Sequence, residues 1–265
     1  MNLKKRNQVA FLILLIFLLF AINYSFLDNF LKGIFFSREK AVVERVVDGD
    51  TVIVNKNESV RLLGINTPEK GEFYFAEAKR FLEELIVNAN RSIEMEKGKE
   101  DKDLYKRLLR YVYINRENAN LKLVENGFAN FYFPSGKDRY YKTFQEAWQE
   151  CVESNKNLCE KSADKCADCI ELKQFDSKKE IIILHNKCSF DCSLNGWNIK
   201  DEGRKKFIFS GFNLPAGREV IIKVGKGTNN ETNLYWQGET YVWTQTGDTM
   251  FLRDKEGKLV LWKNY

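Results

Sequence analysis

The stretch from Arg61 to Glu69, Arg-Leu-Leu-Gly-Ile-Asn-Thr-Pro-Glu, constrains this chain more than any other. Leu62 and Ile65, together with Val60 just before the stretch, have the character of buried strand positions. Pro68 ends that strand, because proline has no N–H to donate to a ladder of strand hydrogen bonds. The polar side chains of the stretch are therefore expected to collect at the end of a buried strand.

A second polar group lies just upstream, in Asp48–Thr51, between two short valine-rich runs. An Asp-Gly pair between strand-forming residues predicts a hairpin turn. Two strand ends can so bring Asp50 close to Asn66, Thr67 and Glu69. Carboxylate, amide and carbonyl oxygens suit Ca²⁺ better than zinc or iron. The sequence therefore predicts that these strand ends can hold a hard cation such as Ca²⁺.

A third piece is Tyr105–Tyr113, whose alternation from Leu109 onward predicts a strand with Arg107 near its start. Arg61 and Arg107 can each hold phosphate oxygens bidentately and stabilise the charge that grows on phosphorus. Glu69 can accept a proton from an attacking water or orient it. A metal ion neutralises a further oxygen. This combination of groups predicts phosphodiester hydrolysis.

These motifs resemble the staphylococcal nuclease (thermonuclease) family, over residues from about Ala41 to about Lys156. The matching segments, in the family's order and spacing, are Val46–Thr51, Arg61–Glu69 and Asp103–Tyr113, followed by Leu123–Ala129. The resemblance implies an OB-type five-stranded barrel with three helices. It also implies a Ca²⁺-dependent endonuclease that cleaves DNA and RNA.

The resemblance assigns roles to seven residues of this chain. Arg61, Glu69 and Arg107 take the catalytic positions, Asp50, Asn66 and the Thr67 carbonyl take the metal positions, and Tyr105 takes a position that contacts a nucleotide phosphate. One residue departs from the pattern, because the family usually has aspartate where this chain has Asn66. That change bears on calcium affinity more than on the type of reaction.

Other elements follow from periodicity and composition. Helices are expected over Phe73–Val87, Asn118–Asn126 and Asp138–Val152, and the mixed-charge segment Lys97–Lys106 is expected to be a loop. Phe131, Tyr132 and Phe133 follow the second helix. Aromatic side chains near a phosphate-binding site can stack on bases, and Tyr132 is the candidate for this role among residues otherwise expected in the barrel core.

Residues 1–37 carry the localisation signal. Lys4, Lys5 and Arg6 precede an uncharged apolar run from Val9 to Ile22, which the following aromatic residues can extend to about 20 residues. Such a segment is either a cleaved signal peptide or an uncleaved membrane anchor. The anchor is favoured because no small-x-small cleavage site follows Ile22. Both alternatives place the remainder outside the cytoplasm, either on a single-pass membrane protein or as a secreted one.

The cysteines cluster after the nuclease-like segment, and there are six in all: Cys151, Cys159, Cys166, Cys169, Cys188 and Cys192. An even number in an exported chain predicts disulfides of undetermined connectivity. The alternative is a structural zinc held by the first four, although only the last pair of those has the spacing of a zinc finger. Residues 157–177 are expected to be a cysteine-rich linker between residues 38–156 and residues 178–265.

Residues 178–265 have a different sequence pattern, with short apolar runs separated by turns such as Leu214–Gly217 and Asp254–Gly257. That spacing predicts an all-β sandwich. The segment resembles a lamin-tail domain in Leu194–Trp197, Asn233–Trp236 and Gly247–Leu252, among other matches. The resemblance implies an immunoglobulin-like binding module whose ligand is unknown.

Three functions compete on these observations. The first is a membrane-anchored or secreted calcium-dependent nuclease acting on DNA, RNA or both. The second is a catalytically inactive OB-fold protein that binds nucleic acid at the cell surface, and the third is a purely structural surface protein. Arg61, Glu69 and Arg107 together favour the enzyme, because simple binding needs no carboxylate. The single histidine, His185, lies far from the motifs and excludes a mechanism built on several histidines.

Overall fold

The computed structural model describes residue 13 and residues 38–265. Apart from residue 13, the predicted membrane segment lies outside these residues, and within them no helix has the length and apolar character needed to cross a membrane. Residues 40–265 form one compact unit. It contains a closed barrel followed by a β-sandwich, so the mainly β architecture with three helices is confirmed.

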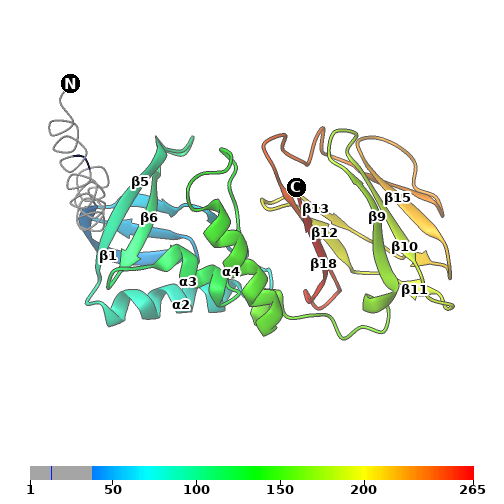
Figure 1. The fold of residues 1–265 in the computed structure, drawn as a ribbon, viewed down its shortest axis with the longest axis horizontal. Coiled ribbons are helices and arrows are strands. Elements are labelled where there is room, and N and C mark those ends of the chain that lie inside the picture. The colour runs from blue at the N-terminus through cyan, green and yellow to red at the C-terminus, as the bar shows by residue number, and fades with distance from the viewer. Residues whose placement is uncertain (1–12, 14–37) are drawn as a thin grey trace, which may run out of the picture. The chain divides into compact units, whose positions relative to one another are not determined.

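The barrel is built from five strands that close on themselves. They are β1 (Glu39–Asp48), β2 (Thr51–Val54), β3 (Glu58–Leu62), β5 (Ser92–Lys102) and β6 (Leu108–Ile114), with the two-residue β7 (Glu117–Asn118) added beyond β6. The order is β3-β2-β1-β5-β6, and a parallel pairing of β3 with β6 completes the closure. A further short pair joins β4 (Ile65–Asn66) to β8 (Asn130–Phe131). Figure 1 shows β1, β5 and β6 as neighbours.

Three helices cover the barrel: α2 (Phe75–Asn88), α3 (Ala119–Glu125) and α4 (Tyr141–Ser154). Each presents an apolar face inward, such as Leu82 of α2 and Trp148 of α4, both fully buried. The side chain of Asn118 caps α3 by accepting a hydrogen bond from the Leu121 amide. Gly127 then ends the helix with φ at +67°, a conformation that favours glycine.

Residues 170–265 form two packed sheets. The first contains β9 (Ile170–Asp176), β10 (Ile181–Asn186), β15 (Glu219–Val224) and β16 (Asn233–Trp236); the second contains β12 (Asn198–Lys200), β13 (Lys206–Ile208), β17 (Thr249–Arg253) and β18 (Leu259–Asn264). A small pair, β11 (Cys192–Ser193) with β14 (Asn213–Leu214), completes the sandwich. Because β9 pairs with β10, part of the segment expected to be a linker belongs to the sandwich.

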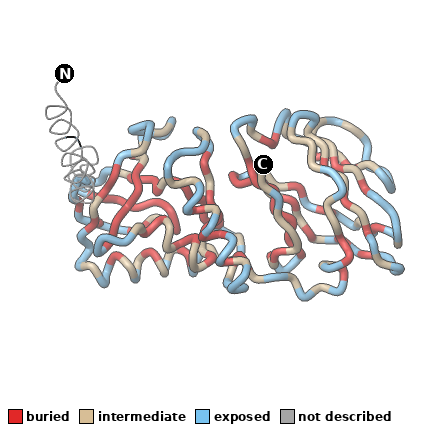
Figure 2. The backbone as a smooth tube through the Cα atoms, in the orientation of Figure 1, coloured by how far each residue is buried: buried red, intermediate tan, exposed pale blue. Residues whose placement is uncertain are grey.

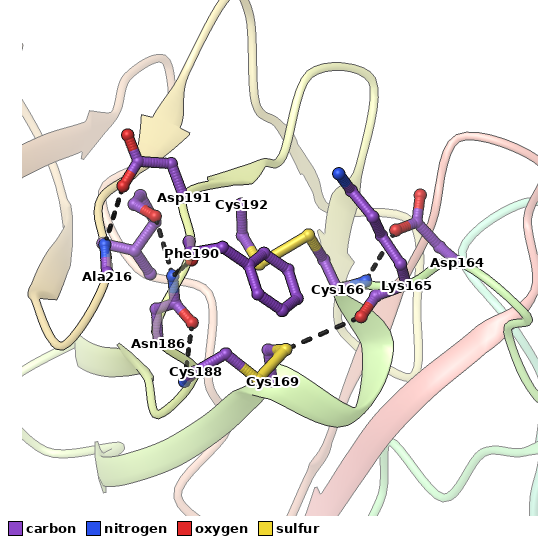
Figure 3. The surroundings of a disulfide bond; sticks show 11 residues. Asp164, Lys165, Cys166, Cys169, Asn186, Cys188, Phe190, Asp191, Cys192 and Ala216 are labelled. Atoms are coloured by element: carbon purple, nitrogen blue, oxygen red, sulfur yellow. Dashed lines mark hydrogen bonds between the residues drawn. A yellow bond between two sulfur atoms is a disulfide. The ribbon is translucent and has the colours of Figure 1, made fainter.

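All six cysteines are paired in disulfides: Cys151–Cys159, Cys166–Cys192 and Cys169–Cys188. The disulfide prediction is confirmed, and the zinc alternative is wrong because its four cysteines are paired. Two of the bonds tie the segment before β9 to the turn after β10, at Cys188 and Cys192 (Figure 3). The fully buried Asn186 holds that turn, since its amide donates to the carbonyls of Phe190 and Leu214.

The barrel and the sandwich share apolar contacts. Phe251 of β17 and Leu259 of β18 belong to the same buried cluster as the barrel core. The rings of Trp148 and Phe251 lie with their centroids 5.2 Å apart. Figure 2 shows how buried residues follow the barrel strands and both sheets of the sandwich. The sandwich is thus packed on the barrel through large side chains, which fixes the loops at their boundary.

Candidate nuclease site

The turn between β1 and β2 presents Asp50 to the end of β4. Asp48 pairs with Thr51, so Gly49 and Asp50 are the two turn residues. The Asp50 carboxylate accepts hydrogen bonds from the Thr67 amide and the Thr67 hydroxyl, both at 3.0 Å. A Cβ on Gly49 would lie 2.8 Å from the Thr67 methyl group, so only glycine permits this close approach. The predicted juxtaposition of Asp50 and Thr67 is confirmed.

Arg61, in β3, is buried at the centre of this group and only 8% exposed. Its Nη2 lies 3.1 Å from Asp50 Oδ2, and donates to the Ile65 carbonyl at 2.9 Å and to Asn66 Oδ1 at 3.3 Å. Its Nη1 donates to the Leu62 carbonyl at 2.5 Å. The guanidinium is therefore held by a carboxylate, an amide oxygen and two backbone carbonyls, and it must turn from some of them to hold a phosphate.

The residues predicted to bind calcium present oxygens of the right kind. Asp50 Oδ2 and Asn66 Oδ1 converge on one cationic nitrogen, Nη2 of Arg61, so both face a positive charge. Burial, and then the negative charge of Asp50, raise the pKa of the neighbouring Asp48. A second positive charge near these carboxylates would relieve that repulsion. By the chemistry of their oxygens, Asp50, Asn66 and the Thr67 carbonyl fit a hard divalent cation.

Arg107 comes directly before β6. The parallel pairing places Arg61 opposite Leu109, so the two arginines lie at neighbouring strands. Asp103 holds Arg107 by accepting from Nε at 2.7 Å and from the Arg107 backbone amide at 2.9 Å. Burial alone would raise the pKa of Asp103, but these hydrogen bonds lower it. No role for Asp103 was predicted from the sequence, although an aspartate two residues before Tyr105 is a common turn-forming signal.

Tyr105 and Tyr132 occupy different surroundings. The Tyr105 side chain is well exposed, and the Arg107 guanidinium carbon lies 5.5 Å from its ring centroid. Tyr132 is half-buried, and its backbone amide donates to the Gly64 carbonyl. Burial and then the charge of Asp201 raise the pKa of Tyr132, while Arg61 lowers it. The role of Tyr132 in stacking stays a prediction.

Glu69 lies at the solvent-exposed edge of the site. Its backbone amide donates to the carboxylate of Glu72 at 3.0 Å, which forms a tight turn after Pro68. Its carboxylate pairs with Nε of Arg204 at 2.8 Å. Arg204 belongs to the loop between β12 and β13, in the sandwich. No signal in the sequence pointed to this residue, because the contact depends on how two separately predicted domains pack.

The comparisons with known proteins agree with this geometry. A model of the family described as "Staphylococcal nuclease homologue" matches residues 59–161, and a model described as "Lamin Tail Domain" matches residues 166–265. A thermonuclease of Staphylococcus intermedius is 33% identical over 132 residues, which cover 46% of this chain and 77% of that protein. This chain belongs to the staphylococcal nuclease family.

Further relatives fit the same family. A thermonuclease of Staphylococcus hyicus is 32% identical over 44% of this chain and 73% of that protein. An uncharacterized endonuclease of Haemophilus influenzae is 34% identical over 42% of this chain and 63% of that protein. Arg61, Glu69 and Arg107 lie inside the segment matched by the nuclease family model, and Asp50 lies just before it. The lamin tail domain begins before β9, at residue 166.

Proposed function

We propose that this staphylococcal nuclease family member hydrolyses phosphodiester bonds of DNA, RNA or both in a calcium-dependent reaction. The observation that carries the proposal is the convergence of Arg61, Asp50, Asn66 and Thr67 at one end of the barrel, with Glu69 and Arg107 at its edge. Thermonucleases among the relatives support the reaction type.

The residues divide the chemistry as follows. Asp50, Asn66 and the Thr67 carbonyl would hold Ca²⁺, which when bound supplies positive charge to the substrate phosphate and to an attacking water. Arg107, already oriented by Asp103, presents its guanidinium to a phosphate oxygen. Arg61 turns from its backbone acceptors to a second phosphate oxygen. Both arginines then stabilise the charge that develops in the transition state.

Glu69 is the candidate proton acceptor. Its carboxylate is partly exposed and therefore accessible to water. It can orient the attacking water and accept its proton, the role that a general base requires. In an inactive nucleic-acid-binding protein, a carboxylate at this position would serve no purpose. Its negative charge would repel the phosphate backbone and weaken binding. Glu69 thus favours the enzyme over the binding protein.

Hydrolysis of denatured DNA and RNA by the purified protein, with calcium or with excess chelator, tests the proposal. We expect activity in calcium and none in chelator. Arg61→Ala and Arg107→Ala are each expected to lower kcat by about two to three orders of magnitude, because each removes transition-state charge stabilisation. Full activity in excess chelator, or unchanged rates in both variants, would contradict the mechanism.

We also propose that the protein works outside the cytoplasm, either anchored by its N-terminal apolar segment or secreted after cleavage. Three disulfides support this location, since such bonds persist in oxidising compartments. The basic residues before Val9 support the same orientation. Protease treatment of intact cells is the test, because a cytoplasmic nuclease domain would remain protected.

A further inference from the structure

We propose that the β12–β13 loop of the lamin tail domain, residues 201–205, is a working part of the nuclease site, and that Arg204 binds a phosphate of the nucleic-acid substrate. The inference rests on the proposed function for its substrate class. It gives the lamin tail domain a role in substrate binding, through a residue that lies outside the nuclease domain.

Two buried amides of the barrel hold the loop. Asn66 of β4 and Asn130 of β8 are direct cross-strand partners. The Asn66 side-chain amide donates to the Gly203 carbonyl at 2.9 Å, and the Asn130 amide donates to the Glu202 carbonyl at 3.1 Å. Paired donors on two consecutive carbonyls fix both the position and the direction of the loop. Both amides are at most 8% exposed, so water competes little for these bonds.

The two carboxylates of the loop, on Asp201 and Glu202, also fix it in place. The Glu202 carboxylate accepts from the Thr249 hydroxyl at 2.5 Å and from the Phe133 amide of the barrel at 3.4 Å. The Asp201 carboxylate accepts from the Lys205 amide at 2.9 Å, which closes the turn. A loop held at these points presents Arg204 at a defined place beside Glu69. This arrangement reduces the conformational entropy that substrate binding would otherwise cost.

Arg204 keeps donors for a ligand. Its Nε pairs with Glu69, its side chain is 62% exposed, and within residues 38–265 its two terminal nitrogens meet no acceptor. An exposed ion pair of this kind is weak, so it cannot hold Glu69 in an inactive state. A guanidinium whose two terminal NH2 groups are free to donate is suited to a phosphate oxygen. The geometry therefore favours substrate contact over inhibition by the loop.

Binding of a fluorescent single-stranded oligonucleotide, measured by anisotropy across salt concentrations in chelator, tests the proposal without cleavage. We expect Arg204→Ala to raise Kd by up to about fivefold and to reduce the salt slope by about 0.7, the loss of one phosphate contact on a single strand. Arg204→Lys should keep the slope, because it retains the charge. Arg218→Ala, which removes an exposed arginine elsewhere in the sandwich, is the matched control and should change neither.

Hydrolysis by the same proteins in calcium separates the alternatives. Substrate contact predicts a higher KM in Arg204→Ala with kcat nearly unchanged. A higher kcat/KM in Arg204→Ala would show that the loop inhibits, and equal behaviour of Arg204→Ala and Arg218→Ala would show that it does neither; both results overturn the proposal. Wild-type protein that binds through Arg204 without cleaving would refute the nuclease function and leave the phosphate contact standing. Wild-type protein that neither binds in chelator nor cleaves in calcium would refute both.

Discussion

Asn66→Asp is the sharpest test of the site, because position 66 faces two partners at once. The Asn66 amide nitrogen donates to the Gly203 carbonyl at 2.9 Å, and its oxygen accepts from Arg61 at 3.3 Å. Aspartate has the same shape and replaces the donor with a second oxygen. One oxygen can still face Arg61 and calcium. The other would lie against the Gly203 carbonyl, where two acceptors repel each other.

Two free-energy changes of opposite effect follow. The first change is in the free energy of calcium binding, because the site gains a negative charge. Unit charges about 4 Å apart attract by about 4 kcal/mol at an effective dielectric near 20. Repulsion from Asp50 and screening by solvent reduce this to a net gain of about 1–2 kcal/mol, or roughly tenfold in calcium affinity. The lost hydrogen bond leaves the Gly203 carbonyl unsatisfied at a buried contact, which costs about 1–3 kcal/mol of stability.

The assay measures each change separately. The calcium concentration for half-maximal hydrolysis should fall about tenfold in Asn66→Asp, and the product termini should not change. The melting temperature in chelator should fall. Asn130→Asp is the matched control, because it loses the same kind of donor to the loop but adds no calcium ligand. It should therefore lower the melting temperature in chelator without changing the calcium midpoint.

Calcium binding by Asn66 and the anchoring of the loop by the two amides can each be refuted independently. An unchanged or higher calcium midpoint in Asn66→Asp would remove Asn66 from the calcium ligands. Melting temperatures in chelator equal to wild type in both aspartate variants would mean that the two amides do not hold the loop.

Two further predictions concern the covalent and titratable groups. Mass spectrometry of unreduced native protein should find the mass of three disulfides, including Cys151–Cys159 within the nuclease domain; six free thiols would contradict both the pairing and the exported location. The melting temperature should fall from pH 5.5 to about 8, because burial, together with the charge of Asp248, raises the pKa of Asp201 to about 7 and that of Glu202 to about 8. Each acid ionises in the unfolded chain at lower pH than in the folded protein, so stability is lost as pH rises through the folded pKa. Asp201→Asn should flatten this dependence by roughly 2 kcal/mol, whereas Glu72→Gln should not, since Glu72, with a pKa of about 2, titrates below this range.

Much of the site could be predicted because its motifs are local. Asp50, Arg61, Asn66 and Thr67 lie within 18 residues of sequence, on strands whose pairing follows from alternation and from one Asp-Gly turn. The prediction of a loop over Lys97–Lys106 was wrong for its first part, because β5 continues to Lys102, and only residues 103–106 form a turn. Its charged side chains are exposed there, so composition alone could not distinguish an exposed strand from a loop.

The remainder depended on long-range contacts that carry no local pattern. The pairing Cys166–Cys192 encloses β9 and β10, and connectivity among six cysteines cannot be read from spacing. The sandwich was predictable as strands and turns, but its packing on the barrel through Trp148 and Phe251 was not. The position of Arg204 depends on that packing, so no sequence motif could have predicted it.

The departure at position 66 has a structural reason in this arrangement. Aspartate, the residue that the resemblance to the family implies at this position, offers only acceptors and could not donate to the Gly203 carbonyl. Asparagine keeps an oxygen toward Arg61 and adds the donor that holds the loop. Asn130, its partner across the β4–β8 pair, does the same for the next carbonyl. The substitution therefore exchanges one negative charge at the proposed calcium site for a fixed contact with the lamin tail domain. A nuclease domain of this family without a lamin tail domain packed against it would gain nothing from asparagine at position 66. Its side-chain amide would then donate a hydrogen bond only to water.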